Sequence, residues 1–445
     1  MNSLNLNFDW LTSGNDSPEI QQTMGMFGLS VGDISLTRNE DTFSQTIRDT
    51  VLVSAYPLAA WIVSSWWRLL YEPLPPAREK PSVNWRMAHE LTAANQGFIW
   101  PRVILASDTE LMQIWSTTSN TTDQQSVRYI NSLDRPFPIN LIEFEQKAKT
   151  FIESVIHRLE ATGIVETPLS GLWKEVQEEF SDPDSSQYRR REAELGFDPD
   201  ECPESVVEDA LCLAKQMGDN TFSEVAPAYG KDISEAKPLS ATIAELTEES
   251  GLYGKPEVSI AHSDSQELPK APWQKANKVA SYLRDQIDMG EKPVTDNKLY
   301  DLLGLHKSEY EAWNPLGRQH ISIALPLANA GFKFHPRKTH PIAKRFELAR
   351  FIGDYLLHSN HGASWLASTD FRTSRQKYQR AFAAEFLCPL SSLQSFLDND
   401  YSESAIEDAS EYFSVSQKTV ESILVNNGLI TSSESISDLE ASCPY

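Results

Sequence analysis

The stretch KRFELARFIGDYLLH, residues 344–358, determines how the C-terminal part of the chain is interpreted. Its apolar residues recur at three- and four-residue spacing, which predicts one helix. Within that helix Arg350 and Asp354 are four residues apart, so they share a helical face. Opposite charges at this spacing can form a charge-assisted hydrogen bond. We therefore expect an Arg350–Asp354 ion pair on one face of this helix.

The segments around this helix predict an α+β fold that is mostly helical. HISIALP (320–326) alternates between polar and apolar residues, as a strand does. NKLYDLLGL is helical in pattern and ends at Gly304, a residue that often follows a helix. The other helices expected here lie at 273–287, 374–389, about 404–413 and about 416–427.

The rest of the chain differs in pattern from one region to the next. FIWPRVILAS (98–107) and TELMQIWSTT (109–118) predict paired strands around a tight turn. Helical spacing begins at Leu141, and it gives way to a stretch rich in Ser, Pro, Glu and Ala. The expected parts are an α+β N-terminal domain at 1–140, a helical segment at 141–218, a linker-like region at 219–270, a C-terminal domain at 271–431 and an acidic tail at 432–445.

Charge is unevenly distributed along the 445 residues, whose net charge is −24. Residues 1–269 contain 20 Lys and Arg against 42 Asp and Glu, whereas residues 270–431 contain 19 against 18. An acidic body repels phosphate backbones. This balance argues against a protein that wraps nucleic acid along its whole length.

The cysteines and the N-terminal sequence predict a cytoplasmic protein. The four cysteines show no C-x-x-C pair and no disulfide-like spacing, which fits a reducing compartment. The first residues, MNSLNLNFDW, have neither the basic nor the apolar region of a signal peptide. Residues 50–67 are uncharged and long enough to be weighed as a membrane span. Their four Ser and Thr residues and Pro57 favour a buried helix that runs to about Tyr71, and no membrane association is expected.

Tryptophan is dense in the N-terminal part of the chain. These side chains either fill the core or form an aromatic pocket or partner interface, since large aromatic residues dominate binding hot spots. Composition leaves both interpretations open. The residues concerned are Trp61, Trp66, Trp67, Trp85 and Trp100.

Three short motifs in the C-terminal domain resemble the ImmA/IrrE family of metallopeptidase-like proteins. They are the RF-x-LA lead at Arg345, the FAAE-x-L-x-P run at Phe382, and the FSVS turn at Phe413. The resemblance covers residues 271–431. It implies a zincin-like domain with a small helix-turn-helix, in which two histidines on one helix and a Glu on the next hold zinc.

None of the four family site positions carries the expected residue. The two histidine positions fall on Arg350 and Asp354, the general base on Phe351 and the third ligand on Tyr378. Arg offers no lone pair to a metal and Phe cannot accept a proton. We expect no catalytic residue and no zinc cofactor at these degenerate positions. Tyr378 is expected to donate its hydroxyl to Asp354.

A shifted metal site is the alternative. Asp354, His358 and His361 follow the spacing D-x3-H-x2-H, and the first two share a helical face. Such a site would make the protein a metal-dependent endopeptidase. The other interpretation of HSNHG (358–362) is a solvated helix C-terminus, where His is favourable against the helix dipole.

Basic residues on the two central helices form a second candidate site. They are expected either to be a solvated face or to bind an anion, such as a phosphate, a nucleotide or an acidic peptide, or a protein partner. Single-stranded nucleic acid stays a weaker possibility because aromatic residues lie nearby. The candidates are Lys344, Arg345, Arg350, Arg375, Lys377 and Arg380.

The two helices expected at about 404–413 and about 416–427 resemble a helix-turn-helix. A DNA reader would place Gln417 and Lys418 on the second helix against the bases, although the first helix is acidic. A DNA-binding regulator is therefore an alternative function. The function we expect first is a peptidase-like pseudoenzyme that regulates through protein–protein interaction.

The resemblance also implies a setting for this function. It points to bacterial regulation with a repressor-type partner, in stress responses, mobile elements or toxin–antitoxin pairs.

Overall fold

The computed structural model is α+β, with more helix than strand, and it divides into two compact units, with the boundary in the sequence between Val207 and Glu208. We call them the N-terminal unit and the C-terminal unit. The residues that the structure describes are 3–14, 16–76, 80–120, 125–248, 250–259, 271–315, 317, 319–328, 331–358 and 364–431.

The N-terminal unit is built on antiparallel sheets. β1 (Leu4–Trp10) pairs along its whole length with β2 (Met24–Val31), whose other edge pairs with β3 (Ile34–Ser35) and β6 (Val51–Ser54). A smaller sheet has the order β5-β4-β9. Its strands are Thr46–Arg48, Asn39–Asp41 and Val127–Tyr129.

The hairpin expected at 98–118 is confirmed, with shorter strands. β7 (Arg102–Ser107) and β8 (Leu111–Thr117) are antiparallel, and β10 (Phe137–Asn140) pairs with the outer edge of β8. Asp108 stabilises the turn because its Oδ1 accepts from the backbone N–H groups of Glu110 at 3.3 Å and Leu111 at 2.8 Å. Residues 108–110 thus separate the strands, two residues more than the expected strand ranges left between them.

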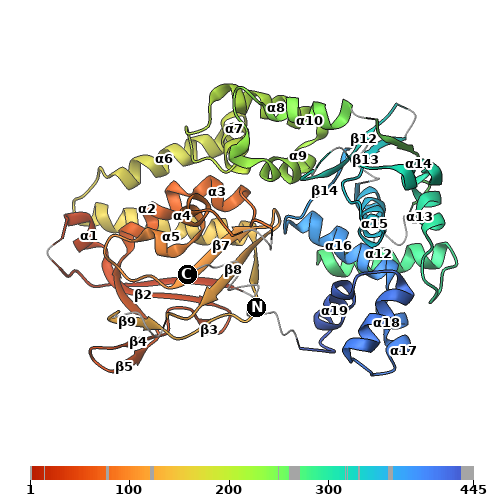
Figure 1. Cartoon of the computed structure of the whole chain (residues 1–445). Helices are drawn as coiled ribbons and strands as arrows, with labels where there is room; N and C mark the ends of the chain where they lie inside the picture. The colour runs from red at the N-terminus through yellow and green to blue at the C-terminus, as the bar shows by residue number, and fades with distance from the viewer. Residues whose placement is uncertain are drawn as a thin grey trace. The chain divides into compact units, whose positions relative to one another are not determined.

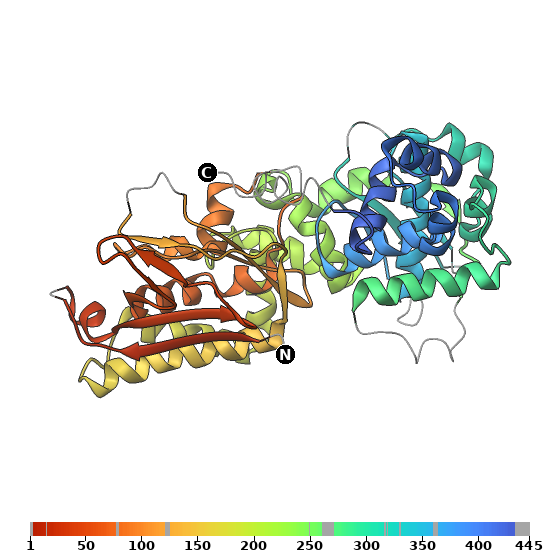
Figure 2. The ribbon, with the colours of Figure 1, turned by 90° about the horizontal axis from the view of Figure 1, so that it is seen from below.

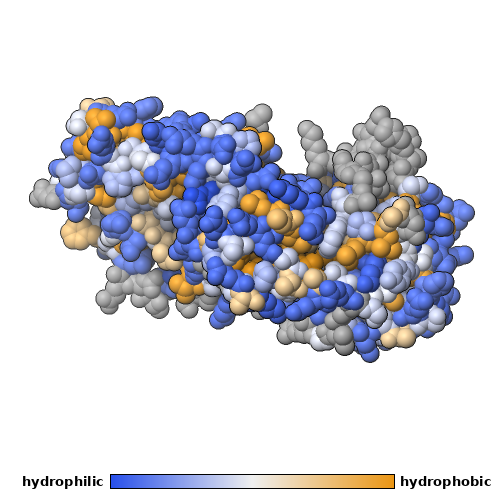
Figure 3. Space-filling view, turned by 90° about the horizontal axis from the view of Figure 1, so that it is seen from above, coloured by the Kyte–Doolittle hydropathy of each residue, from blue (hydrophilic) through white to orange (hydrophobic). Residues whose placement is uncertain are grey.

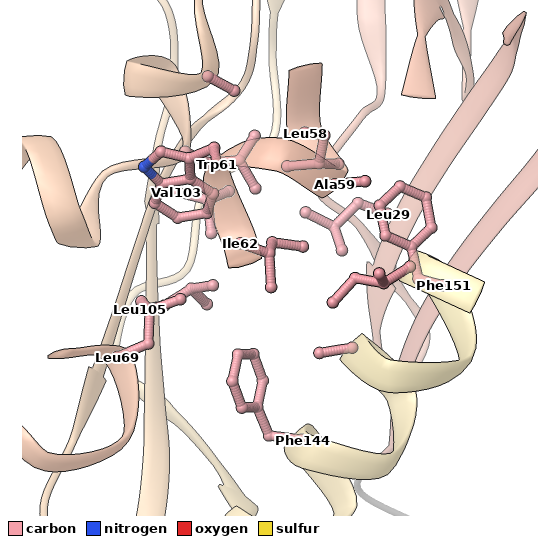
Figure 4. Close-up of a cluster of buried hydrophobic side chains, with 14 of the residues drawn as sticks. Leu29, Leu58, Ala59, Trp61, Ile62, Leu69, Val103, Leu105, Phe144 and Phe151 are labelled. Carbon is pink, nitrogen blue, oxygen red and sulfur yellow. The ribbon is translucent and has the colours of Figure 1, made fainter. Parts of the chain in front are cut away.

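Helices cover the first sheet and form the main core of this unit. α5 (Leu141–Ala161) lies along β1 and β2 (Figure 2) and buries Phe144 and Phe151, as its spacing predicts. α2 (Ala55–Ser64) and α3 (Trp66–Tyr71) replace the single helix expected to run to Tyr71. Figure 4 shows Leu58, Ile62 and Leu105 in the same buried cluster as Phe144 and Phe151 of α5.

Shorter helices complete the N-terminal unit. They are α1 (Pro18–Gln22), α4 (Val83–His89), the 3-10 turn Leu91–Ala94, α6 (Pro168–Ser181) and α7 (Pro183–Glu194). α7 lies in a stretch whose polar sequence suggested only a connection. All five tryptophans singled out above are buried, as the core interpretation predicts.

The C-terminal unit contains an antiparallel sheet of order β11-β13-β12-β14. Its strands are Leu252–Gly254, Phe332–His335, Ser322–Pro326 and Leu366–Ser368. α15 (Pro341–His358) packs on one face, where the rings of Phe334 and Phe351 meet edge to face at 5.4 Å. The helix and the strand expected at these places are confirmed.

Helices surround this sheet and α15 (Figure 1). α16 (Ser374–Leu387) packs against both α15 and α12 (Pro272–Gln286). α15 and α16 approach most closely at Gly353, where an added Cβ would lie 2.7 Å from the Phe382 ring. The remaining helices are α8 (Glu204–Met217), which crosses the boundary between the units, α9 (Asp219–Val225), α10 (Leu239–Glu248), α13 (Asp296–Leu303), α14 (Lys307–Ala312), α17 (Leu390–Leu397), α18 (Glu403–Phe413) and α19 (Gln417–Asn426).

The linker-like region at 219–270 contains regular structure. α9, α10 and β11 lie within it, while residues 260–270 are outside the described part of the chain. The tail at 432–445 is also outside it.

No helix among the described residues is long and apolar enough to span a membrane. Hydrophilic residues cover most of the face drawn in Figure 3, with smaller groups of apolar residues between them.

Candidate functional site

The candidate site lies where α15, α16, α9 and β14 meet inside the C-terminal unit. α15 contributes Arg350 and Asp354, and α16 contributes Arg375 and Gln376. The Thr373 side chain caps α16 by accepting the Gln376 N–H at 3.2 Å, which fixes the start of that helix beside α15. All five side chains belong to buried residues.

Asp354 is bound on both carboxylate oxygens by Arg375. The Arg375 Nε–Oδ1 and Nη2–Oδ2 distances are both 2.7 Å, and the Ala367 N–H also donates to Oδ2 at 3.1 Å. Burial alone would raise the pKa of Asp354, but the Arg375 charge and the hydrogen bonds from Arg375 and His358 lower it well below its usual range. The carboxylate is therefore charged and its acceptor sites are occupied.

The expected Arg350–Asp354 pair does not form. Arg350 Nη2 donates instead to the Thr369 carbonyl oxygen at 2.8 Å and to Gln376 Oε1. Arg375 pairs with Asp354 instead, because its guanidinium on the neighbouring helix α16 donates to both carboxylate oxygens in a bidentate arrangement. Burial and the nearby Arg380 and Arg337 charges lower the pKa of Arg350 to about 9.

Arg375 also ties α9 to this pair. Its Nη1 donates to Thr221 Oγ1 at 3.1 Å, and both Arg375 Nη2 (3.1 Å) and Thr221 Oγ1 (2.8 Å) donate to the Trp365 carbonyl oxygen. Glu224 on α9 accepts the Thr373 hydroxyl at 2.7 Å, and burial raises the pKa of Glu224. The network thus holds α9, α15, α16 and the strand β14 together.

Phe351 and Tyr378 play no polar role in this network. Phe351 is fully buried against Phe334. Tyr378 is 2% exposed, and burial and the Asp354 charge raise the pKa of its hydroxyl. Its expected donation to Asp354 is absent from the hydrogen bonds of the described residues, where Arg375 and Ala367 occupy the carboxylate.

Only two of the three alternative metal ligands, Asp354 and His358, lie within the described residues. His358 Nδ1 lies 3.4 Å from Asp354 Oδ1 and donates to the Asp354 carbonyl oxygen at 3.0 Å. His361 lies outside the described residues. Within the described ranges, no group of three His, Cys, Asp or Glu side chains could hold a metal ion.

The six basic candidates are not gathered on one face. Arg345 donates to the carbonyl oxygens of Val294 (2.6 Å) and Ser414 (3.2 Å) and pairs with Asp296, so it joins α15 to α13 and to the α18–α19 turn. Lys344 Nζ donates to the Trp313 carbonyl oxygen at 3.0 Å.

The other basic candidates lie on or near α16. Arg380 is close enough to Arg350 for its charge to lower the pKa of Arg350, and Arg380 Nη1 donates to the Phe371 carbonyl oxygen at 2.9 Å. Arg375 is committed to Asp354, and Lys377 is half-buried on α16.

The candidate DNA contacts are exposed. Gln417 and Lys418 begin α19, whose apolar face packs into the core through Val420 and Leu424. The facing helix α18 exposes acidic residues, including Glu407 and Asp408. This pair of helices therefore presents mixed charge around the two candidate contacts.

Sequence reasoning missed two members of the site. Glu224 is 2% exposed on α9, in the region expected to be a linker. Glu347, also 2% exposed, accepts the Ser322 hydroxyl, and burial raises the pKa of Glu347. One usable signal was present for Glu347, since an acidic residue at a buried position of an apolar helix needs a partner.

No protein-family model, no curated protein and no solved structure matches this chain.

Proposed function

We propose that the C-terminal unit is a peptidase-like module without metal-dependent catalysis, which regulates by binding a protein partner. The observation that supports this proposal is the two-pronged Arg375–Asp354 pair. It occupies the carboxylate at one of the three positions where the resemblance would place metal ligands.

A metal ion at Asp354 would have to displace Arg375. Asp354 is fully buried and Arg375 is 7% exposed. Separating a buried pair leaves an uncompensated charge and costs about 3–5 kcal/mol. Neighbouring Arg350 adds a second positive charge that repels a cation. Both effects favour a stable ion-pair core over metal binding.

The proposed partner is a protein, and the ImmA/IrrE resemblance suggests a repressor-type regulator in a bacterial setting. The acidic balance of residues 1–269 favours a partner with a basic surface, because complementary charge steers association. DNA binding through Gln417 and Lys418 is less favoured, since α18 beside them is acidic.

The test is to isolate the full chain from its source cells with and without a chelator and to follow its complexes by size-exclusion chromatography. The proposal expects a stoichiometric protein complex that persists in the chelator, with the partner uncleaved. Partner cleavage that stops in the chelator would overturn the proposal in favour of a metal-dependent endopeptidase.

A further inference from the structure

The short segment that follows β14 is contacted by basic side chains from other parts of the C-terminal unit. α15 packs against both β14 and α16 (Figure 1). Arg350 on α15 donates from Nη2 to the Thr369 carbonyl oxygen at 2.8 Å. Arg380 on α16 donates from Nη1 to the Phe371 carbonyl oxygen at 2.9 Å. The two arginines therefore bind the backbone on either side of Asp370.

Two more cations contact the Asp370 carboxylate itself. Arg337, just after β13, donates to Oδ2 from Nη1 at 3.0 Å and to Oδ1 from Nη2 at 2.7 Å. Lys338 Nζ lies 3.7 Å from Oδ1, which is longer than a hydrogen bond. We call Arg337, Lys338, Arg350 and Arg380 the cationic cluster. Its four basic side chains surround one half-exposed carboxylate.

Several donors of the cationic cluster have no acceptor in the described part of the chain. Arg350 is 5% exposed, and its Nη1 donates to no described residue and, unlike its Nε, keeps accessible surface. Arg380 is half-buried and uses only Nη1 there, and the Lys338 side chain is 34% exposed. Charged donors make strong hydrogen bonds to anions. These donors are thus available to an anion from solution.

The carboxylates near the cationic cluster do not balance its charge. Burial lowers the pKa of both Arg350 and Lys338, and the carboxylates that act against this shift are Asp370 and Glu347. Glu347 is 2% exposed and already accepts the Ser322 hydroxyl. Four cations against two carboxylates leave a formal excess of two positive charges.

Arg380 has one further charged neighbour of each sign. Burial is the main cause of its lowered pKa, and beyond that Arg372 lowers the pKa and Glu224 raises it, so this pair leaves the formal excess unchanged. Burial, followed by the charges of Arg380 and Arg337, lowers the pKa of Arg350 to about 9. A nearby negative charge would stabilise cations held in this way.

We propose that the cationic cluster binds one phosphate group as a dianion, either as inorganic phosphate or at the end of a small phosphomonoester. Its oxygens accept from Arg350 Nη1, Arg380 and Lys338, and its two negative charges balance the formal excess. Guanidinium groups suit phosphate because they present several donors in a planar fork. This proposal specifies the anion that sequence analysis left open for Arg350 and Arg380, and it does not depend on a protein partner.

Calorimetry on the full chain at constant ionic strength tests the proposal without any partner. The probes are inorganic phosphate, phenyl phosphate and acetate, a monoanion. We expect phosphate to bind at millimolar concentration or below, and acetate to bind at least about tenfold more weakly, which corresponds to about 1.4 kcal/mol. Tighter binding of phenyl phosphate than of phosphate would identify a monoester site, and the reverse order a site for the free ion.

Two substitutions at partly or largely exposed side chains should change the affinity in opposite directions. Lys338→Gln should weaken phosphate binding by about five- to tenfold, because it removes a charged donor. Asp370→Asn should strengthen it by at least about twofold, because it removes the negative charge nearest to the ligand. A purely structural role of Asp370 would not produce such a gain.

Lys307→Gln and Asp301→Asn are the controls, since they remove the same charges at exposed positions of α14 and α13, outside the cationic cluster. They should leave the affinity unchanged. The proposal is overturned if neither phosphate probe binds at millimolar concentration or if acetate binds equally tightly. It is also overturned if Lys338→Gln, folded by circular dichroism, binds phosphate like the wild type, or if folded Asp370→Asn binds it no more tightly.

Discussion

At the scale of single residues, the C-terminal unit depends on charges that it has removed from water. The opposite charges of Asp354 and Arg375 neutralise one another through two hydrogen bonds, so both side chains can be buried away from water. Such a pair contributes little compared with an apolar core, but removing one member is costly. This asymmetry makes the pair sensitive to substitution.

Asp354→Asn should lower the free energy of unfolding by about 3–5 kcal/mol, because Arg375 stays buried without a counter-charge. Urea unfolding of the purified variant measures this change. Glu311→Gln is the control, since the Lys307–Glu311 pair is more than half exposed and should contribute less than about 1 kcal/mol. Equal losses in the two variants would contradict the account of the pair.

The same residue predicts a dependence on pH. The pKa of Asp354 is lowered in the folded protein, whereas an unfolded Asp titrates near about 3.9. Its stabilising contribution should therefore be complete above about pH 4 and be lost as the pH falls further. Asp354→Asn should flatten the unfolding free energy against pH in this acid range, as measured by urea titrations.

As the pH falls, His335 should begin to destabilise the folded protein at a higher pH than Asp354 does. It is 2% exposed, neither ring nitrogen has a partner among the described residues, and burial and Lys333 lower its pKa to about 4. Because the unfolded side chain titrates near 6.5, stability should fall by on the order of 3 kcal/mol from pH 6.5 to 4. His335→Phe should reduce that slope in urea titrations, whereas His306→Gln, at an exposed histidine, should not.

Sequence reasoning predicted that Asp354 would be paired, but it assigned the wrong partner. The rule for residues four apart is local, so it selected Arg350 on the same helix. The actual partner is 21 residues away on α16 and becomes available only when the two helices pack. Contacts of this kind follow from tertiary structure and cannot be read from spacing.

At the scale of elements, apolar spacing predicted most helices of the chain, including α5, α12 and α15. α7 was missed because it is held by charged contacts. Arg189 bonds to Glu179 and Glu192 at 2.7 Å each, and Arg191 bonds to Glu194 at 2.6 Å. A sequence this rich in charged residues predicts an exposed connection, because it does not show that neighbouring helices bury and pair these charges.

Gly353→Ala should be destabilising by about 1–3 kcal/mol, although Ala is normally the better helix former. The added Cβ would lie 2.7 Å from the Phe382 ring where α15 and α16 cross. Gly171→Ala on α6 has nothing within 4 Å and should instead be stabilising by about 0.5–1 kcal/mol. Thermal unfolding of the two variants checks this difference in sign, and a stabilised Gly353→Ala would refute the close packing.

At the scale of the whole molecule, the two units have separate cores. We expect Asp354→Asn to speed amide hydrogen exchange in the C-terminal unit and to leave α5 and the β1–β2 pair unchanged, since local openings follow cooperative units. Exchange measured by mass spectrometry on the full chain gives both values. Equal acceleration in both units would show that they unfold together.

Metal content distinguishes an ion pair at the Asp354 position from a metal ligand there. The full chain, purified without chelator, is measured by elemental analysis beside folded Asp354→Asn and His358→Ala variants. We expect no stoichiometric zinc or manganese in any of the three. About one equivalent of metal per chain in the wild type, lost from the variants, would contradict it.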